Sequence, residues 1–195
     1  CLEKIRRNMF FNKKNQPNNH QDNDINQVKL PSQAYIIAEV IKGCRFKNYL
    51  ELGIYYGATY NYIKQFVDRA VGVDIEHKDF IPEDKFFCMT TDEFFAQNQE
   101  KFDAVFIDAA HEYDQVKKDF DNAMRVLNKG GVVFLHDTDP YSKEYMGETF
   151  CNDAYKMNDY IANQGIYSFI TIPMDETGLS MVMKKDDCRY REFLQ

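Results

Sequence analysis

Acidic side chains stand at the ends of successive short apolar stretches of this chain, and histidines accompany two of them. These residues are Glu51, Asp74, Glu76, Asp92, Asp108, His111, His136 and Asp137. Carboxylates accept hydrogen bonds from hydroxyl groups and hold divalent cations, and a histidine can accept a proton near neutral pH. Random placement of surface acids would rarely give this pattern, so we expect a binding or catalytic site at the ends of these stretches.

The elements that must position these residues alternate between strand and helix. The expected strands are residues 49–52, 70–75, 86–89, 104–107 and 132–135, and the expected helices are residues 34–43, 58–67, 92–97 and 113–127, the last closed by residues 128–131. Strands that are joined through helices pair in parallel. Two further strands, residues 166–172 and 179–183, are separated by a loop too short for a crossover and predict an antiparallel hairpin.

The fold class that follows is α/β, a Rossmann-like, doubly wound, mostly parallel seven-stranded sheet with a C-terminal antiparallel hairpin. In such a sheet, ligands bind beyond the carboxyl ends of the strands, near the point where the strand order reverses. The acidic and histidine side chains would therefore meet at one edge.

Composition sets the domain organisation and excludes several partners. Residues 12–27 are rich in Asn and Gln and hold one strong hydrophobe, so we expect a flexible segment over residues 1–30 and one folded domain over residues 31–195. Thirty-one acidic against 24 basic residues give a net charge of -7, which argues against a nucleic-acid partner. Without a secretory signal or an apolar run near the roughly 18 residues that cross a bilayer, we expect a soluble, cytoplasmic protein without a membrane partner.

The cysteines are scattered along the chain, and none forms a C-x-x-C pair. They are Cys1, Cys44, Cys88, Cys151 and Cys188. We expect reduced thiols, since neither a disulfide framework nor a zinc knuckle is indicated. The chain begins with a cysteine, which leaves open whether its natural N-terminus is included.

Two glycines four residues apart, Gly53 and Gly57, follow the first expected strand in the stretch ELGIYYGAT. A backbone without Cβ lets a ligand approach closely, although a tight strand-to-helix turn explains the pair equally well. The spacing is not G-x-G-x-x-G, which disfavours NAD or FAD, and the sequence has no G-x-x-x-x-G-K-[ST] loop. Asp74, at the end of the second expected strand, fits a carboxylate that accepts the hydrogen bonds of a ribose diol.

In five motifs and in their order, residues 31–195 resemble a class I S-adenosylmethionine-dependent methyltransferase. The motifs are ELGIYYGAT, VGVD, TTD, FDAVFIDAAHEY and NKGGVVFLHDT, and the closing hairpin is similar to the last two strands of that family. The narrower resemblance is to the metal-dependent small-molecule O-methyltransferases typified by catechol O-methyltransferase. Bacterial enzymes of the macrocin and cephalosporin-tailoring type resemble the chain as closely.

The resemblance implies S-adenosylmethionine as the cofactor and assigns a part of it to each strand end. Asp74 would hold the ribose, Thr91 and Asp92 would border the adenine, and Asp108 would lie beside the methionine amine. The residues implied around the methionine portion are Glu51, Gly53, Tyr55 and Gly57, with the Thr59 hydroxyl near its carboxylate. Tyr55 stands where most methyltransferases have a glycine, a departure shared with the catechol-type group.

The resemblance also implies a Mg²⁺ ion held by Asp108 and Asp137, with Thr138 in place of the Asn of the resembled enzymes. A hydroxyl is a poorer neutral ligand than an amide oxygen, but Mg²⁺ retains water readily. An alternative is a softer ion such as Mn²⁺, Fe²⁺ or Zn²⁺, bound by His111, His136 and the two aspartates, because imidazole suits those metals.

His111 stands where the catechol enzymes have a lysine general base. It would take the proton of the acceptor hydroxyl, and Asp108 and Asp137 would complete the catalytic group by fixing the cation. A hydrogen-bonded histidine at a helix start is the structural alternative for His111. We expect His136 to be mainly structural, or to support the site through residues that it contacts.

The activity expected from the resemblance is transfer of a methyl group to a hydroxyl of a small molecule, such as a sugar, an antibiotic-like compound or a phenol. A metal-independent methyltransferase on the same fold and a non-catalytic module that only binds the cofactor are the alternatives. A nucleotide-dependent oxidoreductase is disfavoured by the glycine spacing. The sequence leaves the acceptor and the oligomeric state open, and a homodimer is one option.

Overall fold

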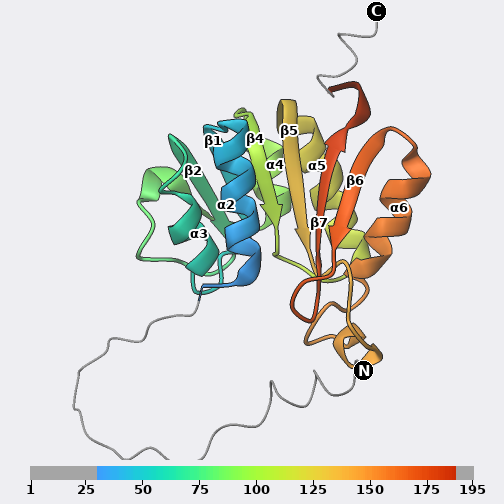
Figure 1. Cartoon of the computed structure of the whole chain (residues 1–195). Coiled ribbons are helices and arrows are strands. Elements are labelled where there is room, and N and C mark those ends of the chain that lie inside the picture. The colour runs from blue at the N-terminus through green and yellow to red at the C-terminus, as the bar shows by residue number, and fades with distance from the viewer. Residues whose placement is uncertain (1–29, 188–195) are drawn as a thin grey trace, which may run out of the picture.

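Residues 30–187 are described by the computed structural model, and they form one mixed sheet with helices on both faces (Figure 1). Most of the predicted Asn-rich segment, together with Cys1 and Cys188, lies outside the described residues. The domain boundary near residue 30 therefore stays a prediction. Among the helices of residues 30–187, none is long and apolar enough to cross a membrane.

The sheet has seven strands in the order β3-β2-β1-β4-β5-β7-β6. They are β1 (Asn48–Leu52), β2 (Arg69–Asp74), β3 (Phe86–Cys88), β4 (Phe102–Ile107), β5 (Leu127–His136), β6 (Tyr167–Ile172) and β7 (Leu179–Lys184). β1 pairs in parallel with both β2 and β4, and β7 lies antiparallel between β5 and β6. The predicted doubly wound sheet with a closing antiparallel hairpin is confirmed, and its strand order reverses between β1 and β4.

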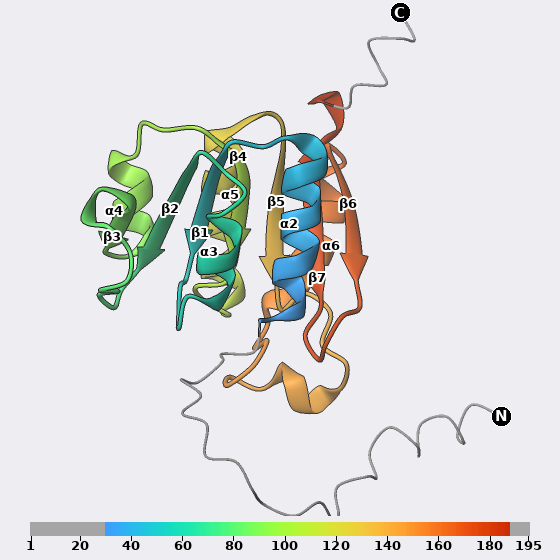
Figure 2. The ribbon, with the colours of Figure 1, turned by 60° about the vertical axis from the view of Figure 1, so that its left-hand side comes forward.

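Helices cover both faces of the sheet (Figure 2). They are α2 (Ser32–Cys44), α3 (Ala58–Ile63), α4 (Thr91–Gln97), α5 (Tyr113–Val126) and α6 (Met157–Gln164), with 3₁₀ turns at Glu83–Lys85, Lys143–Met146, Ala154–Lys156 and Lys185–Asp187. α2 and α3 pack on one face, and α4, α5 and α6 pack on the other. Each face has its own apolar core, which holds the strands between two helix layers.

The apolar pattern of the sequence explains this packing. In α2, Ala34, Ile37, Ala38 and Ile41 recur with the period of a helix, and all four are fully buried. β4 is buried on both faces, as expected of a parallel strand between two helix layers. Amphipathic helices therefore clamp a central strand from both sides.

Two boundaries differ most from those expected. α3 ends at Ile63 rather than near residue 67, because hydrogen bonds of the i to i+3 type turn the chain after it. The helix expected over residues 113–127 ends at Val126, but residues 128–131 do not close it as expected, since β5 already begins at Leu127. Leu127 pairs with Phe102 of β4, so these residues belong to the sheet and not to the end of the helix.

A close backbone contact joins the carboxyl ends of β1 and β4. Leu52 pairs with Ile107, so the residues that follow, Gly53 and Asp108, lie side by side. A Cβ atom at Gly53 would lie 2.2 Å from the Asp108 carbonyl oxygen, and the φ angle of Gly53 is +84°. Only glycine fits both the contact and the conformation.

Gly53→Ala should therefore lower the free energy of unfolding by roughly 3 kcal/mol or more, because the new methyl group meets backbone that cannot move aside. Gly130→Ala is the matched control. Gly130 has a φ of +77° but open space where its Cβ would lie, so only the conformational cost of about 1–2 kcal/mol applies. Urea denaturation measures both, and equal losses would show that the contact imposes no constraint.

Candidate active site

Two adjoining cavities lie at the carboxyl edge of the parallel strands, beside the point where the strand order reverses. Their volumes are about 300 Å³ and about 620 Å³. Gly53, Asp74, Ile75 and Ala109 line both cavities, so one ligand can extend from the first into the second. The edge expected from the strand ends is hollow, as a small-molecule site requires.

The residues that the sequence singled out divide between the two cavities. Thr91 and Asp92 line the first cavity. Tyr55, Asp108, His111, His136 and Asp137 line the second. The predicted adenine border and the predicted reaction centre thus lie at opposite ends of one connected space.

The glycine loop after β1 is held by Asp74. The Asp74 Oδ2 accepts the backbone N–H groups of Ile54 at 2.8 Å and Tyr55 at 3.1 Å, and Oδ1 accepts that of Glu76 at 2.8 Å. The Lys78 ammonium lies 3.6 Å from Oδ2. Because a carboxylate offers about four acceptor positions, Oδ1 keeps one for a ligand hydroxyl.

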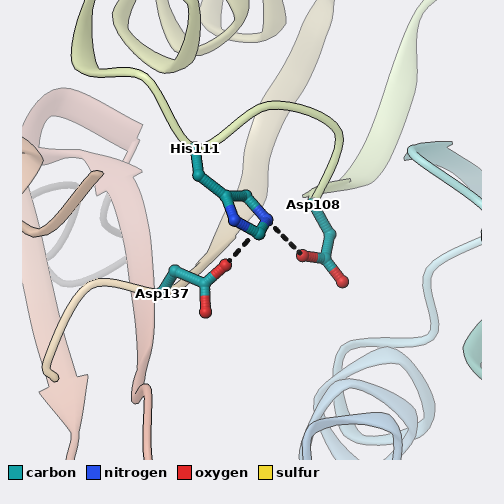
Figure 3. Close-up of side chains that lie close together, drawn as sticks. All are labelled: Asp108, His111 and Asp137. Carbon is teal, nitrogen blue, oxygen red and sulfur yellow. Dashed lines mark ion pairs between the residues drawn. The ribbon is translucent and has the colours of Figure 1, made fainter. Parts of the chain in front are cut away.

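Asp108, His111 and Asp137 converge in the second cavity (Figure 3). Asp108 follows β4, His111 lies just before α5, and Asp137 follows β5. The His111 Nε2 lies 3.1 Å from the Asp137 Oδ2 and 4.0 Å from the Asp108 Oδ1. Asp137 has a φ of +62°, a strained conformation for a residue with Cβ that is typical of functional sites.

The other ring nitrogen of His111 limits what its Nε2 can do. Nδ1 bonds to the carbonyl oxygen of Phe150, which can only accept, so Nδ1 carries a hydrogen. In the neutral ring, Nε2 then carries a lone pair and lies beside two carboxylates. These three acceptors repel one another, because no hydrogen lies between them. The cluster therefore requires either a proton on Nε2 or a metal ion among the three groups.

His136 lies between the same two carboxylates. Its Nδ1 is 3.2 Å from the Asp108 Oδ1 and 3.3 Å from the Asp137 Oδ1. Burial alone would lower the pKa of His136, but the charges and hydrogen bonds of Asp108 and Asp137 outweigh it and hold that pKa well above its usual value. Burial would likewise raise the pKa of Asp137, and the hydrogen bond from His136 lowers it instead. A positive His136 thus lets two aspartates lie close together.

Thr138 is turned toward β7 and lines neither cavity. It is buried, and its hydroxyl accepts a hydrogen bond from Ser180 at 2.8 Å. The structure therefore does not bring the predicted metal ligand Thr138 to the two aspartates, because Ser180 already binds its hydroxyl. His111 completes the group of potential ligands instead.

Three residues predicted at the methionine portion also line neither cavity. Glu51 is buried within β1, where the Tyr49 hydroxyl donates to its carboxylate, and burial raises the pKa of Glu51 well above its usual value. Gly57 precedes α3 with a φ of +74°, and Thr59 is buried in the first turn of that helix. These residues shape the loop and its helix rather than its open surface.

Two residues of α5 complete the first cavity. The Gln115 Nε2 donates to the Thr91 hydroxyl at 3.2 Å and to the Asp119 Oδ1 at 3.1 Å. Asp119 is fully buried, and among the described residues nothing bonds to its Oδ2. Burial raises the pKa of Asp119 to about 6. A buried carboxyl group of this kind at a cavity is typical of binding sites.

Sequence reasoning missed Lys78, Gln115 and Asp119. Gln115 and Asp119 follow His111 at intervals of four, so one helical face carries them along the same side of the site. That four-residue interval was the signal in the sequence that could have identified both residues. Lys78 sits in an irregular loop, and nothing in its neighbourhood in the sequence indicates that it would be only 8% exposed beside Asp74.

The raised pKa of Asp119 predicts a pH dependence of stability. An aspartate whose pKa is raised from about 4 in the unfolded chain to about 6 in the folded protein costs stability as it ionises, so the free energy of unfolding falls between pH 4 and pH 6. Two pKa units correspond to about 3 kcal/mol. Relative to Asp119→Asn, the wild-type protein should lose about that much across this range.

Urea denaturation from pH 4 to pH 7 measures this difference. Asp121→Asn makes the same change on the same helix, where Asp121 bonds to Lys117 and Tyr160, and serves as the control. A wild-type curve parallel to that of Asp119→Asn would show that the buried carboxyl group ionises without cost.

A family of methyltransferase domains matches residues 50–138, which run from β1 to just after β5. No curated protein matches the chain in sequence. The match covers Asp74, Asp108, His111 and Asp137, whereas Thr149, Phe150 and Thr177, which also line the second cavity, lie outside it.

Solved structures share the fold at low sequence identity. A Staphylococcus aureus protein assigned as a caffeoyl-CoA O-methyltransferase is 19% identical with a TM-score of 0.62, covering 78% of this chain and 82% of its own. An O-methyltransferase from Bacillus cereus in complex with S-adenosylhomocysteine is 16% identical with a TM-score of 0.61, covering 83% of each chain.

A third structure holds a metal as well. The MycE methyltransferase of the mycinamycin biosynthetic pathway, in complex with Mg, S-adenosylhomocysteine and mycinamycin VI, is 15% identical with a TM-score of 0.59, covering 80% of this chain and 50% of its own. The fold common to these proteins agrees with the resemblance drawn from the five motifs. The chain therefore has the fold of the class I S-adenosylmethionine-dependent methyltransferases, and the part of it that a methyltransferase family matches is residues 50–138.

Proposed function

We propose that this protein transfers the methyl group of S-adenosylmethionine to a hydroxyl oxygen of a small molecule. The observation that carries the proposal is the pair of connected cavities, of which the second contains Asp108, His111 and Asp137. Groups that can activate a hydroxyl lie in the second cavity. The methionine end of the cofactor would therefore extend into it and leave the adenine in the first.

The cofactor fits the residues at the junction of the cavities. The free acceptor position of the Asp74 Oδ1 suits a ribose hydroxyl, and Gly53 lines both cavities with backbone alone. When bound, the cofactor would supply an activated methyl carbon. The chain then has to hold the acceptor oxygen in line with that carbon and remove its proton.

The donor set of Asp108, His111 and Asp137 fits a divalent cation, and we propose that one binds there. An imidazole among the ligands favours Mn²⁺, Fe²⁺ or Zn²⁺, while the carboxylates also suit Mg²⁺ with water ligands. A cation at this position would lower the pKa of the acceptor hydroxyl. His111 would then act as a ligand and not as the base. Its Nδ1 is bonded to Phe150, so Nε2 is its only free nitrogen, and the cation would occupy that atom.

A metal-independent reaction is the second candidate, and the His111 tautomer with its hydrogen on Nδ1 favours it. With Nδ1 bonded to Phe150, the His111 Nε2 would accept the proton of the acceptor hydroxyl. Asp137, 3.1 Å away, would stabilise the resulting imidazolium. The acceptor as a sugar, antibiotic-like compound or phenol, the cytoplasmic location and a homodimer all stay predictions.

Cofactor binding and turnover should separate in two variants. Asp74→Ala should raise the dissociation constant of S-adenosylhomocysteine about 10- to 100-fold, because a hydrogen bond to a charged group contributes about 1.5–3 kcal/mol. Asp137→Ala should abolish turnover and leave that constant nearly unchanged. Isothermal calorimetry and release of S-adenosylhomocysteine with a library of hydroxyl compounds measure the two quantities.

Asp68→Ala, which removes an exposed carboxylate paired with Lys47, is the control for both measurements. Cofactor affinity unchanged in Asp74→Ala would contradict the ribose assignment. Failure of the wild-type protein to bind S-adenosylhomocysteine would contradict the proposed function itself.

Metal binding is tested with Mn²⁺, whose electron paramagnetic resonance signal reports the bound ion. The wild-type protein should bind one ion, Asp137→Ala should lose it, and His111→Ala should weaken it. His77→Ala changes an exposed histidine paired with Asp79 and serves as the control. Turnover that survives EDTA would reject the metal and favour His111 as the base.

A further inference from the structure

The neighbours of Gln115 permit only one orientation of its carboxamide. Its Nε2 lies 3.1 Å from the Asp119 Oδ1 and 3.5 Å from the Asp92 Oδ1, and both carboxylates can only accept when ionised. A flipped amide would place an oxygen against these oxygens. The NH₂ group of Gln115 must therefore face them.

Thr91 strengthens this orientation. Its hydroxyl oxygen accepts a hydrogen bond from the Gln115 Nε2 at 3.2 Å. Both hydrogens of the Gln115 amide then have protein partners. Among the described residues no donor bonds to the Gln115 Oε1, and Gln115 lines the first cavity. Oε1 is thus the polar atom that Gln115 offers to a ligand.

We propose that the Gln115 Oε1 accepts a hydrogen bond from the exocyclic amino group of a 6-aminopurine in the first cavity, and that Asp119 is the positioning residue that holds this acceptor in place. The inference rests on the proposed function, which puts the purine of the cofactor in this cavity. A 6-oxopurine presents an acceptor at the same position, so two acceptors would meet. The pair Gln115 and Asp119 therefore selects adenine over hypoxanthine.

Burial and the bond to Gln115 suit Asp119 to this role. It is fully buried, and its Oδ1 already binds the Gln115 amide. The Oδ2 atom has no partner among the described residues, so the carboxyl group carries an unsatisfied polar atom that packing alone would not favour. An aliphatic side chain would remove this cost, but it would also let the amide flip.

Calorimetric titration with S-adenosylhomocysteine and with its 6-oxo analogue, S-inosylhomocysteine, tests the proposal. The wild-type protein should prefer the adenosyl ligand at least tenfold. Gln115→Leu should weaken adenosyl binding about three- to tenfold and leave inosyl binding unchanged or improved. Asp119→Asn, whose amide can donate to a flipped Gln115, should reduce the preference several-fold by improving inosyl binding.

Asp121→Asn is the matched control, since it makes the same change two residues further along α5 without touching the first cavity. It should keep the wild-type preference. If Gln115→Leu weakens both ligands equally, or if Asp119→Asn keeps the full preference, the inference is wrong while the proposed function stands. If the wild-type protein binds neither ligand, the proposed function fails and the inference fails with it.

Discussion

The contact between Gly53 and the backbone of Asp108 is the constraint on which the whole site depends. It brings the ends of β1 and β4 together at the point where the strand order reverses. On one side of this contact the loop N–H groups reach Asp74, and on the other the Asp108 carboxylate reaches His136. A side chain at Gly53 would separate the two halves, so the cofactor loop and the reaction centre are coupled through a single backbone approach.

The sequence predicted the fold and the strand ends because both follow from local patterns. Asp108 and Asp137 could be placed at one edge, since parallel strands all end there. Thr138 could not be placed, because its direction depends on Ser180 in a strand more than forty residues away. Gln115 was missed for a related reason: the four-residue interval indicated its contact with Asp119, but its partners Thr91 and Asp92 lie on α4, more than twenty residues away.

The charges of the site explain why a cationic ligand suits it. Asp74, Asp108 and Asp137 lie at the cavities, while Lys78 and His136 offset only part of their charge. A sulfonium, an ammonium group or a divalent cation would each lower the mutual repulsion of the carboxylates. The overall net charge of -7 acts in the same direction, because it raises the local concentration of cations around the protein.

Two side chains at the site could present either a donor or an acceptor, and acceptor-only partners decide both. The Phe150 carbonyl takes the Nδ1 hydrogen of His111, so Nε2 is the ring nitrogen left to bind a proton or a metal ion. The Asp119 carboxylate and the Thr91 hydroxyl accept the amide hydrogens of Gln115, which leaves Oε1 as the free acceptor. With Asp74 added, acceptors dominate the polar surface of both cavities. Such a surface favours a ligand rich in donors, and ribose hydroxyls, a 6-amino group and an acceptor hydroxyl supply them.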